Sequence, residues 1–415
     1  MNRLRNNLGK SMVYNIIAFI ALWYFYFSSS FTLRPFPQLF WICLAVISIL
    51  SAIIHHYKLK KIDVYFLGGM MILVLFSIFS TDTFGSILIT FNYVIYYLVA
   101  RMISVNCSSK TIFKILMFFS IVHLICVYIQ ILVPGIYLSH ILPLLPQGVH
   151  NEIMEQMKYN FAYYGFTVQT GMIAMYLSIG TILSMVRICE SKNKKNKIIF
   201  MIIMILFLIA TFFTVRRGST VVTIVIITLI YYNLKGNALS KIFVGISVVL
   251  LISLVGLENI PGLSGILNKF DSLVASGSIM NGRDSLFSNA IASLSMKPLF
   301  GYGIGQIETA MGYSWLENSY LLILVECGVI GAIVFFIPYI NIFKNTIRRC
   351  RNFKKEKMFF TFSVYIQIQY VLMSVIENYL AAPINVFLFF LIVFVGEKNY
   401  YEEESSKIES YMRRR

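Results

Sequence analysis

The chain has 415 residues, of which 58% are apolar and only 13% are charged, and its formal net charge is +17. Apolar runs of 17 to 25 residues recur along it, as a bilayer core about 30 Å thick requires of the helices that cross it. The composition therefore excludes an ordinary soluble domain and predicts a polytopic membrane protein. The cysteines are spread without pairing or Cys-x-x-Cys spacing, so we expect neither disulfides nor a zinc site.

Taken in chain order, the apolar runs predict an all-α fold with about twelve membrane-spanning helices. The predicted spans are residues 12–31, 38–54, 62–80, 84–103, 112–133, 162–186, 198–214, 219–234, 242–257, 316–343, 358–376 and 379–396. An even number of spans puts both termini on one side of the membrane. We therefore expect a single transmembrane domain over residues 1–415, with residues 397–415 as its cytoplasmic tail.

The Lys and Arg residues are divided unequally between the two sides of this predicted topology. All but seven lie in the tails and connections on the side of the termini; the seven are Arg34, Lys158, Arg216, Arg217, Lys269, Arg283 and Lys297. This bias places both termini in the cytoplasm. The excess of Lys and Arg over Asp and Glu is thus explained by the membrane topology and by contacts with membrane lipids. We expect no nucleic-acid partner.

Two connections on the outer side are long, at residues 134–161 and 258–315. Loops of more than about 15 residues are usually functional, so we expect the activity outside the cytoplasmic membrane. No ATP or nucleotide sugar is available there, and an enzyme must use a donor that arrives already activated. The large loop is expected to contain short amphipathic helices, because apolar residues recur at helical spacing after Asn281 and Gly282; they are Leu286, Phe287, Ala290, Ile291 and Leu294.

Three outward arginines are candidate binding residues. Arg216 and Arg217 lie in TFFTVRRGSTVV, between two apolar runs joined by almost no loop. Positive charge has no topological use on this face and is costly near hydrocarbon, which favours function, although snorkelling to phospholipid headgroups is the alternative. Arg283 lies in an apparent helix cap, Asn281 to Asp284, where a cation opposes the helix macrodipole.

The segment KPLFGYGIGQ contains Gly301, Gly303 and Gly305. It is not a phosphate-binding loop of the nucleotide type, because no strand precedes it and no P-loop Lys follows it. We expect these glycines to allow a tight, close-packed return of the chain from the surface helix to the next span.

Glu317 and Asn318 open the tenth predicted span, and Glu326 lies nine residues further along it. A carboxylate at Glu317 is consistent either with a helix cap or with a general base for a sugar hydroxyl. Glu326 falls on the opposite side of the helix, so we expect it to pair inside the bundle and not to share a site with Glu317.

Several motifs of this chain are similar to those of a known family. The order of the spans, VRRG at an outer junction, NGR before an amphipathic segment, PLFGYGIG and ENSYLLILVECGVIG together resemble the bacterial O-antigen polymerase and O-antigen ligase superfamily. The resemblance implies a metal-independent, inverting glycosyltransferase without a cofactor. It implies that undecaprenyl-diphosphate-linked oligosaccharides are the substrates, at the outer face of the bacterial inner membrane, with a chain-length regulator and a flippase as further partners.

Carried over by residue, the resemblance implies that Arg216 or Arg217 binds the diphosphate and that Arg283 corresponds to the arginine of the large loop. The ligases carry a histidine where this chain has Glu317, which resembles the polymerases. We therefore predict a polymerase with Glu317 and Arg283 as catalytic residues, and with Asp284, Asn318 and Tyr320 as supporting residues. A ligase is the alternative, and a lipid-linked oligosaccharide flippase is disfavoured because the chain shows no repeated halves.

Overall fold

The computed structural model describes residues 2–30, 32–235, 283–313, 316–351 and 358–412. Helices make up most of this described part, and no strand occurs in it. Its elements are α1 (Asn2–Tyr26), α2 (Pro37–Ile54), α3 (Lys61–Phe76), η1 (Ser77–Phe79), α4 (Thr83–Asn106), α5 (Ser109–Leu132), α6 (Pro134–Ile136), η2 (Tyr137–Ile141), η3 (Leu142–Leu144), η4 (Gln147–Val149), α7 (His150–Asn160), α8 (Thr170–Glu190), α9 (Lys194–Phe212), α10 (Arg217–Lys235), α13 (Arg283–Met296), α14 (Ile307–Met311), α15 (Ser319–Arg351), α16 (Met358–Met373) and α17 (Pro383–Met412).

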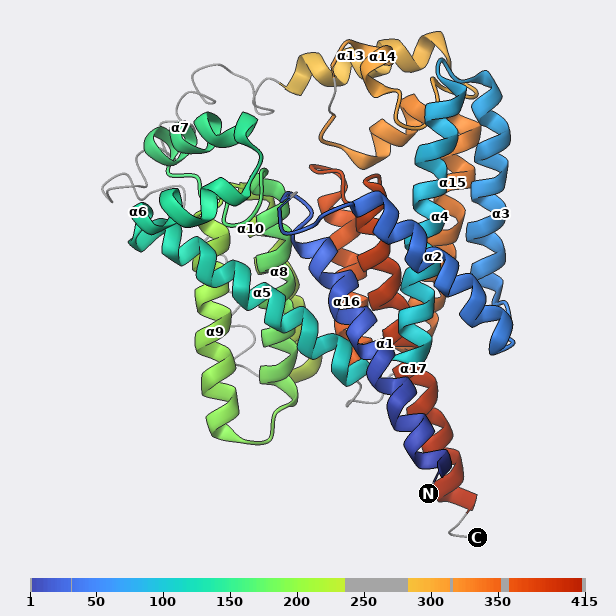
Figure 1. Ribbon diagram of the computed structural model, residues 1–415, viewed down its shortest axis with the longest axis vertical. Coiled ribbons are helices and arrows are strands. Elements are labelled where there is room, and N and C mark those ends of the chain that lie inside the picture. The colour runs from blue at the N-terminus through green and yellow to red at the C-terminus, as the bar shows by residue number, and fades with distance from the viewer. Residues whose placement is uncertain (1, 31, 236–282, 314–315, 352–357, 413–415) are drawn as a thin grey trace.

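The all-α, polytopic character is confirmed. Within the described ranges, eight helices are long and apolar enough to cross a membrane, and two shorter apolar helices cover residues 12–26 and 358–373. The predicted span at residues 242–257 lies outside the described residues, so the count of twelve stays a prediction. Figure 1 shows the free ends of α1 and α17 at one end of the bundle, and α7, α13 and α14 at the opposite end.

The span predicted at 12–31 ends at Tyr26, and another predicted boundary is wrong by more. The span expected at 162–186 begins at Thr170, and residues 161–169 form an irregular segment that leads into α8. The reason lies in α5, where the buried Gln130 side-chain oxygen accepts hydrogen bonds from the backbone N–H groups of Tyr164 and Gly165, both at 2.9 Å. The segment thus satisfies its backbone groups without being helical. Among the candidate spans of the described residues, α8 is the most enclosed, with 83% of its most apolar 18 residues buried.

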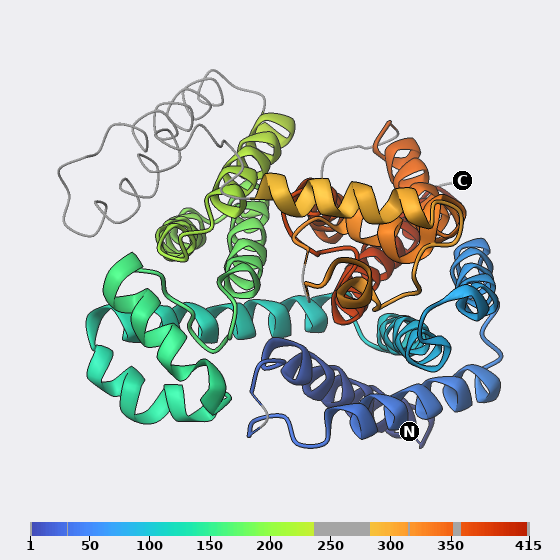
Figure 2. The same cartoon turned by 90° about the horizontal axis from the view of Figure 1, so that it is seen from above.

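The surface helix expected in the large outer loop is present as α13, which lies across the end of the bundle above α15 (Figure 2). Leu286, Phe287 and Leu294 pack against the core and Ala290 is fully buried. Ile291 was expected on the same face, but it is 58% exposed, because it lies one residue, or about 100°, beyond Ala290. The apolar face of α13 is therefore narrower than predicted.

Helix α15 is broken at Gly328 (φ 65°), and the KPLFGYGIGQ segment fills the break. The N–H groups of Tyr302 and Gly303 donate to the carbonyls of Val325 and Glu326, at 3.2 and 2.7 Å. In the other direction, Val329 and Ile330 donate to the carbonyls of Pro298 and Leu299, at 2.8 and 3.2 Å. These bonds satisfy the helical groups that the break leaves unpaired. The sequence had predicted one uninterrupted span at 316–343.

Close approach of two backbones explains the glycines of this interlock. A Cβ atom added at Gly301 would lie 2.4 Å from the carbonyl oxygen of Glu326, and one at Gly328 would lie 2.3 Å from the carbonyl carbon of Leu299. Both glycines also have positive φ angles, which other residues adopt at a cost. The prediction that the glycine-rich turn serves close packing is confirmed.

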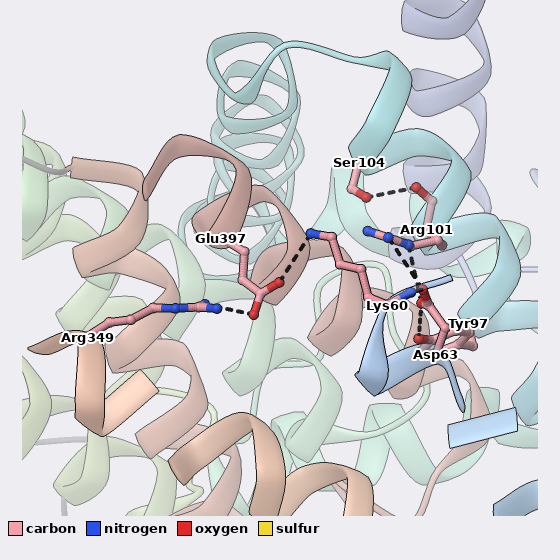
Figure 3. A network of polar contacts seen from close by, with 7 residues as sticks. All are labelled: Lys60, Asp63, Tyr97, Arg101, Ser104, Arg349 and Glu397. Atoms are coloured by element: carbon pink, nitrogen blue, oxygen red, sulfur yellow. Dashed lines mark hydrogen bonds and ion pairs between the residues drawn. The ribbon is translucent and has the colours of Figure 1, made fainter. Parts of the chain in front are cut away.

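A polar network ties α3, α4, α15 and α17 together at the end of the bundle where the termini lie (Figure 3). Glu397 lies 2.7 Å from Arg349 Nη1 and 3.7 Å from Lys60 Nζ. Asp63 lies 3.3 Å from Arg101 Nε and accepts a hydrogen bond of 2.6 Å from the Tyr97 hydroxyl. Burial lowers the pKa of Lys60, and the charge of Glu397 opposes that shift.

Candidate functional site

The turn between α9 and α10 places Arg216 directly before the first residue of α10. The turn is held by a hydrogen bond of 2.7 Å from Thr214 Oγ1 to the Thr211 carbonyl, and by one of 3.1 Å from Tyr163 N–H to the Phe213 carbonyl. Val215 has a φ of 58°. A β-branched residue in the left-handed region costs about 1–3 kcal/mol, and such strain is concentrated at functional sites.

Arg216 is the centre of an ionic cluster formed by three separate parts of the chain. Its Nη1 atom lies 3.0 Å from Glu317 Oε1 and 3.0 Å from Glu377 Oε1. Its Nε atom donates to Thr170 Oγ1 at 2.7 Å. Within the described ranges, Arg216 Nη2 donates no hydrogen bond, and the side chain is 27% exposed. Protein groups therefore hold the guanidinium at Nε and Nη1, and Nη2 is the nitrogen that can bind a ligand.

The structure separates the two interpretations of the Glu317-Asn318 pair. Asn318 is the cap of α15: its Oδ1 atom accepts from Leu321 N–H at 2.9 Å, and its Nδ2 atom donates to the Val375 carbonyl at 2.9 Å. Glu317 precedes this cap and directs its carboxylate to Arg216 instead. Tyr320, expected as a supporting residue, donates to the Val371 carbonyl at 3.0 Å. That contact joins α15 to α16 and lies outside the ionic cluster.

Glu377 is the member of the cluster that was not singled out from the sequence. It lies in the connection between α16 and α17, and its backbone carbonyl accepts a hydrogen bond of 3.0 Å from Ser319 Oγ. Ser319 thereby binds this connection to the start of α15, next to Glu317. A partial signal for it exists in the sequence, because a Glu-Asn pair occurs at residues 317–318 and again at 377–378, as it also does at 258–259.

Arg217, Arg283 and Asp284 are the other candidate residues of the site. Arg217 is the half-buried first residue of α10. Arg283 opens α13 as expected, but the side chains of Arg283 and Asp284 lie outside the described residues, as does the predicted cap at 281–282. The expected meeting of Arg283 with the Arg216 cluster therefore stays a prediction.

Glu326 lies away from the cluster, as the sequence indicated. It is 5% exposed, and its partner is the backbone N–H of Gly305 in the loop that fills the α15 break. Nine residues of helix separate it from Glu317, which is about 13 Å along the axis. Its role is in the interlock of loop and helix.

The segment that precedes α8 reaches the electrostatic field of Arg216. Burial and the charge of Glu152 raise the pKa of Tyr164 to about 12, and the positive charge of Arg216 opposes that rise. The long segment before α8 thus borders the same cluster. Among the residues that the structure describes, no group of three or more His, Cys, Asp or Glu side chains is arranged to hold a metal ion.

A family model described as O-antigen ligase matches residues 201–336. The matched region runs from α9 into α15 and contains Arg216, Arg217, Arg283 and Glu317, but neither Thr170 nor Glu377. The match supports the resemblance to the O-antigen polymerase and ligase superfamily, and with it an enzyme in general; it does not separate polymerase from ligase. No curated protein matches the chain.

Proposed function

We propose that the protein is a surface-polysaccharide polymerase of the outer face of the bacterial inner membrane. It transfers a growing glycan from undecaprenyl diphosphate to a new lipid-linked repeat unit, with inversion and without a metal ion. The observation that carries the proposal is the Arg216 cluster, where a guanidinium whose Nη2 atom has no partner among the described residues faces a carboxylate that is not a helix cap.

The cluster supplies the two functions that the transfer needs. The acceptor hydroxyl oxygen bonds to the anomeric carbon while the bond from that carbon to the diphosphate oxygen breaks, and undecaprenyl diphosphate leaves with the electron pair. Arg216, with Arg217 and Arg283, neutralises the charge that develops on the diphosphate, since a planar guanidinium matches phosphate oxygens. Glu317 accepts the proton of the attacking hydroxyl.

An O-antigen ligase is the second candidate, favoured by the description of the matching family model. A ligase uses the same donor but transfers the glycan to a lipid A core. The carboxylate at Glu317, where the resemblance implies a histidine in ligases, supports the polymerase. The two functions differ in the acceptor, so an assay with both acceptors separates them.

The test uses the purified protein in liposomes with a lipid-linked repeat unit, offered alone or together with a lipid A core acceptor. We expect a ladder of lipid-linked polymer without the core acceptor. Replacement of Arg216, Arg217 or Arg283 by Ala should lower its rate about 100-fold or more, as loss of a charge-stabilising donor does. Lys158→Ala is the matched control, because this outward cation is exposed and lies over the Tyr159 ring, 4.9 Å from its centroid.

Two results would contradict the proposal. Transfer of glycan only to the core acceptor, with no ladder, would identify a ligase. Full-length polymer from all three arginine variants would remove the proposed site.

A further inference from the structure

We propose that Glu377 is a positioning residue, which together with Thr170 holds Arg216 in place while Glu317 exchanges its contact with Arg216 for the acceptor hydroxyl. This inference rests on the proposed function. It assigns different roles to two carboxylates that make the same contact, each with its Oε1 atom 3.0 Å from Arg216 Nη1.

The first argument is charge. One guanidinium cannot neutralise two carboxylates, and the two Oε1 atoms lie no more than 6.0 Å apart, because each is 3.0 Å from the same nitrogen. Like charges at this separation repel each other. Support from other groups offsets this repulsion, so a carboxylate that is fixed beside α8 keeps its place when the contacts of Arg216 change.

The second argument is the position of Glu377 at the first turn of α8. A Cβ atom added at Gly171 would lie 2.9 Å from Glu377 Oε2, so the carboxylate occupies the space that the missing side chain leaves. The first turn of a helix carries unpaired N–H groups and a partial positive charge, which favour an ionised carboxylate. Since α8 is the most enclosed span, Glu377 rests against a rigid part of the bundle.

The backbone of Glu377 is also held. Its N–H donates to the Met373 carbonyl at 2.8 Å, and its carbonyl accepts from Ser319 Oγ at 3.0 Å. The peptide units on both sides of Glu377 are thus tied to α16 and α15, which fixes the backbone from which the side chain reaches the space beside Gly171.

Thr170 adds the second fixed contact. It is 8% exposed, lies in the same first turn of α8, and accepts from Arg216 Nε at 2.7 Å. When Glu317 turns toward an acceptor hydroxyl, Arg216 keeps Thr170 at Nε and Glu377 at Nη1. The guanidinium then stays in one orientation, with Nη2 directed at the diphosphate. A fixed guanidinium loses less entropy when it binds the diphosphate.

The experiment compares Glu377→Gln, Glu377→Asp and Gly171→Ala with Glu317→Gln in the liposome polymerisation assay. For the Glu377 and Gly171 variants we expect kcat/KM for the lipid-linked donor to fall about 10- to 100-fold, while the dependence of kcat on pH keeps the shape of the wild-type profile. Glu377→Asp should recover part of the loss. Glu317→Gln should lower kcat itself and remove the acidic limb of the pH profile, because the base is gone.

Gly148→Ala is the matched control for Gly171→Ala, since a Cβ atom at Gly148 meets nothing within 4 Å. The melting temperature of each variant in detergent is measured alongside activity. If Glu377→Gln fails to fold, Glu377→Asp and Gly171→Ala test the positioning role of Glu377, because both variants retain a carboxylate at position 377.

The outcomes separate this inference from the proposed function. If the wild type makes polymer and Arg216→Ala does not, but Glu377→Gln and Gly171→Ala match the wild type, the positioning role is wrong and the function stands. Loss of the acidic limb in Glu377→Gln would make Glu377 the base and overturn the assignment. If the wild type makes no polymer from lipid-linked repeat units, the proposed function fails.

Discussion

Arg216 illustrates how much a single residue depends on its surroundings at a membrane boundary. A guanidinium near hydrocarbon is costly unless it is paired, and this one is paired with two carboxylates and a hydroxyl. A lipid-facing snorkelling arginine would direct its charge outward, whereas Arg216 directs most of its donors to protein. The arrangement therefore favours a binding role over a topological one.

For single residues, the contribution of Asn318 to stability and that of Glu317 to activity can be measured separately. We predict that Asn318→Ala lowers stability by about 1 kcal/mol, because it removes the cap of α15, and leaves much of the polymerisation activity. We predict the reverse for Glu317→Gln, which leaves the cap intact and removes the proposed base. Thermal unfolding in detergent and the liposome assay give the two quantities. A large loss of stability in Glu317→Gln with unchanged specific activity would make Glu317 a structural residue.

At the scale of elements, the interlock between the 298–305 segment and α15 determines where the outer loop returns to the bundle. The four backbone hydrogen bonds across the break at Gly328 join the loop to the middle of a spanning helix. Because α15 begins with Asn318 beside Glu317, a displacement of the loop would be transmitted toward the ionic cluster. The glycines of the interlock thus support the site indirectly.

We predict that Gly328→Ala or Gly301→Ala destabilises the protein by about 3 kcal/mol or more, because the added Cβ meets backbone atoms that cannot move aside. The matched control is Gly68→Ala in α3, where a Cβ meets nothing within 4 Å. That variant should be neutral or about 1 kcal/mol more stable, through helix propensity. Melting temperatures in detergent test both statements. A wild-type melting temperature for Gly328→Ala would show that the break is not required.

At the scale of the whole molecule, the two ends of the bundle have different chemistry. The end with the termini contains the network of Asp63, Arg101, Arg349 and Glu397, in which cations are matched by carboxylates inside the protein. The opposite end contains the Arg216 cluster, bordered by the first outer loop. The unequal charge of the connections predicts that the end with the termini faces the cytoplasm.

We predict the sidedness from single cysteines in a cysteine-free variant. A cysteine in place of Lys158, on α7, should react in intact cells with a membrane-impermeant maleimide. A cysteine in place of Lys195, in the first turn of α9, should react only after the membrane is opened. Both positions are exposed, so access to reagent depends on topology alone. The opposite pattern would invert the orientation and place the Arg216 cluster in the cytoplasm.

Much of this protein follows from local patterns in the sequence. Apolar runs determine spanning helices because each helix satisfies its own backbone hydrogen bonds in lipid. The excess of Lys and Arg in the tails and connections on one side predicts the orientation, and it too is read from short segments of sequence. The surface helix at α13, the close-packed glycines and the position of Arg216 at an outer junction were all predictable in the same way, because each depends on residues within one turn or one loop.

The contacts that define the candidate site were decided only by the tertiary structure. Thr170 and Glu317 are 46 and 101 residues from Arg216 along the chain, and no periodicity relates such positions. Glu377 joins the cluster because Asn318 and Ser319 bind its connection to the start of α15. The break in α15 likewise exists because a distant loop supplies hydrogen-bond partners. Local hydropathy determines which segments cross the membrane, whereas the packing of the helices decides which of their ends meet.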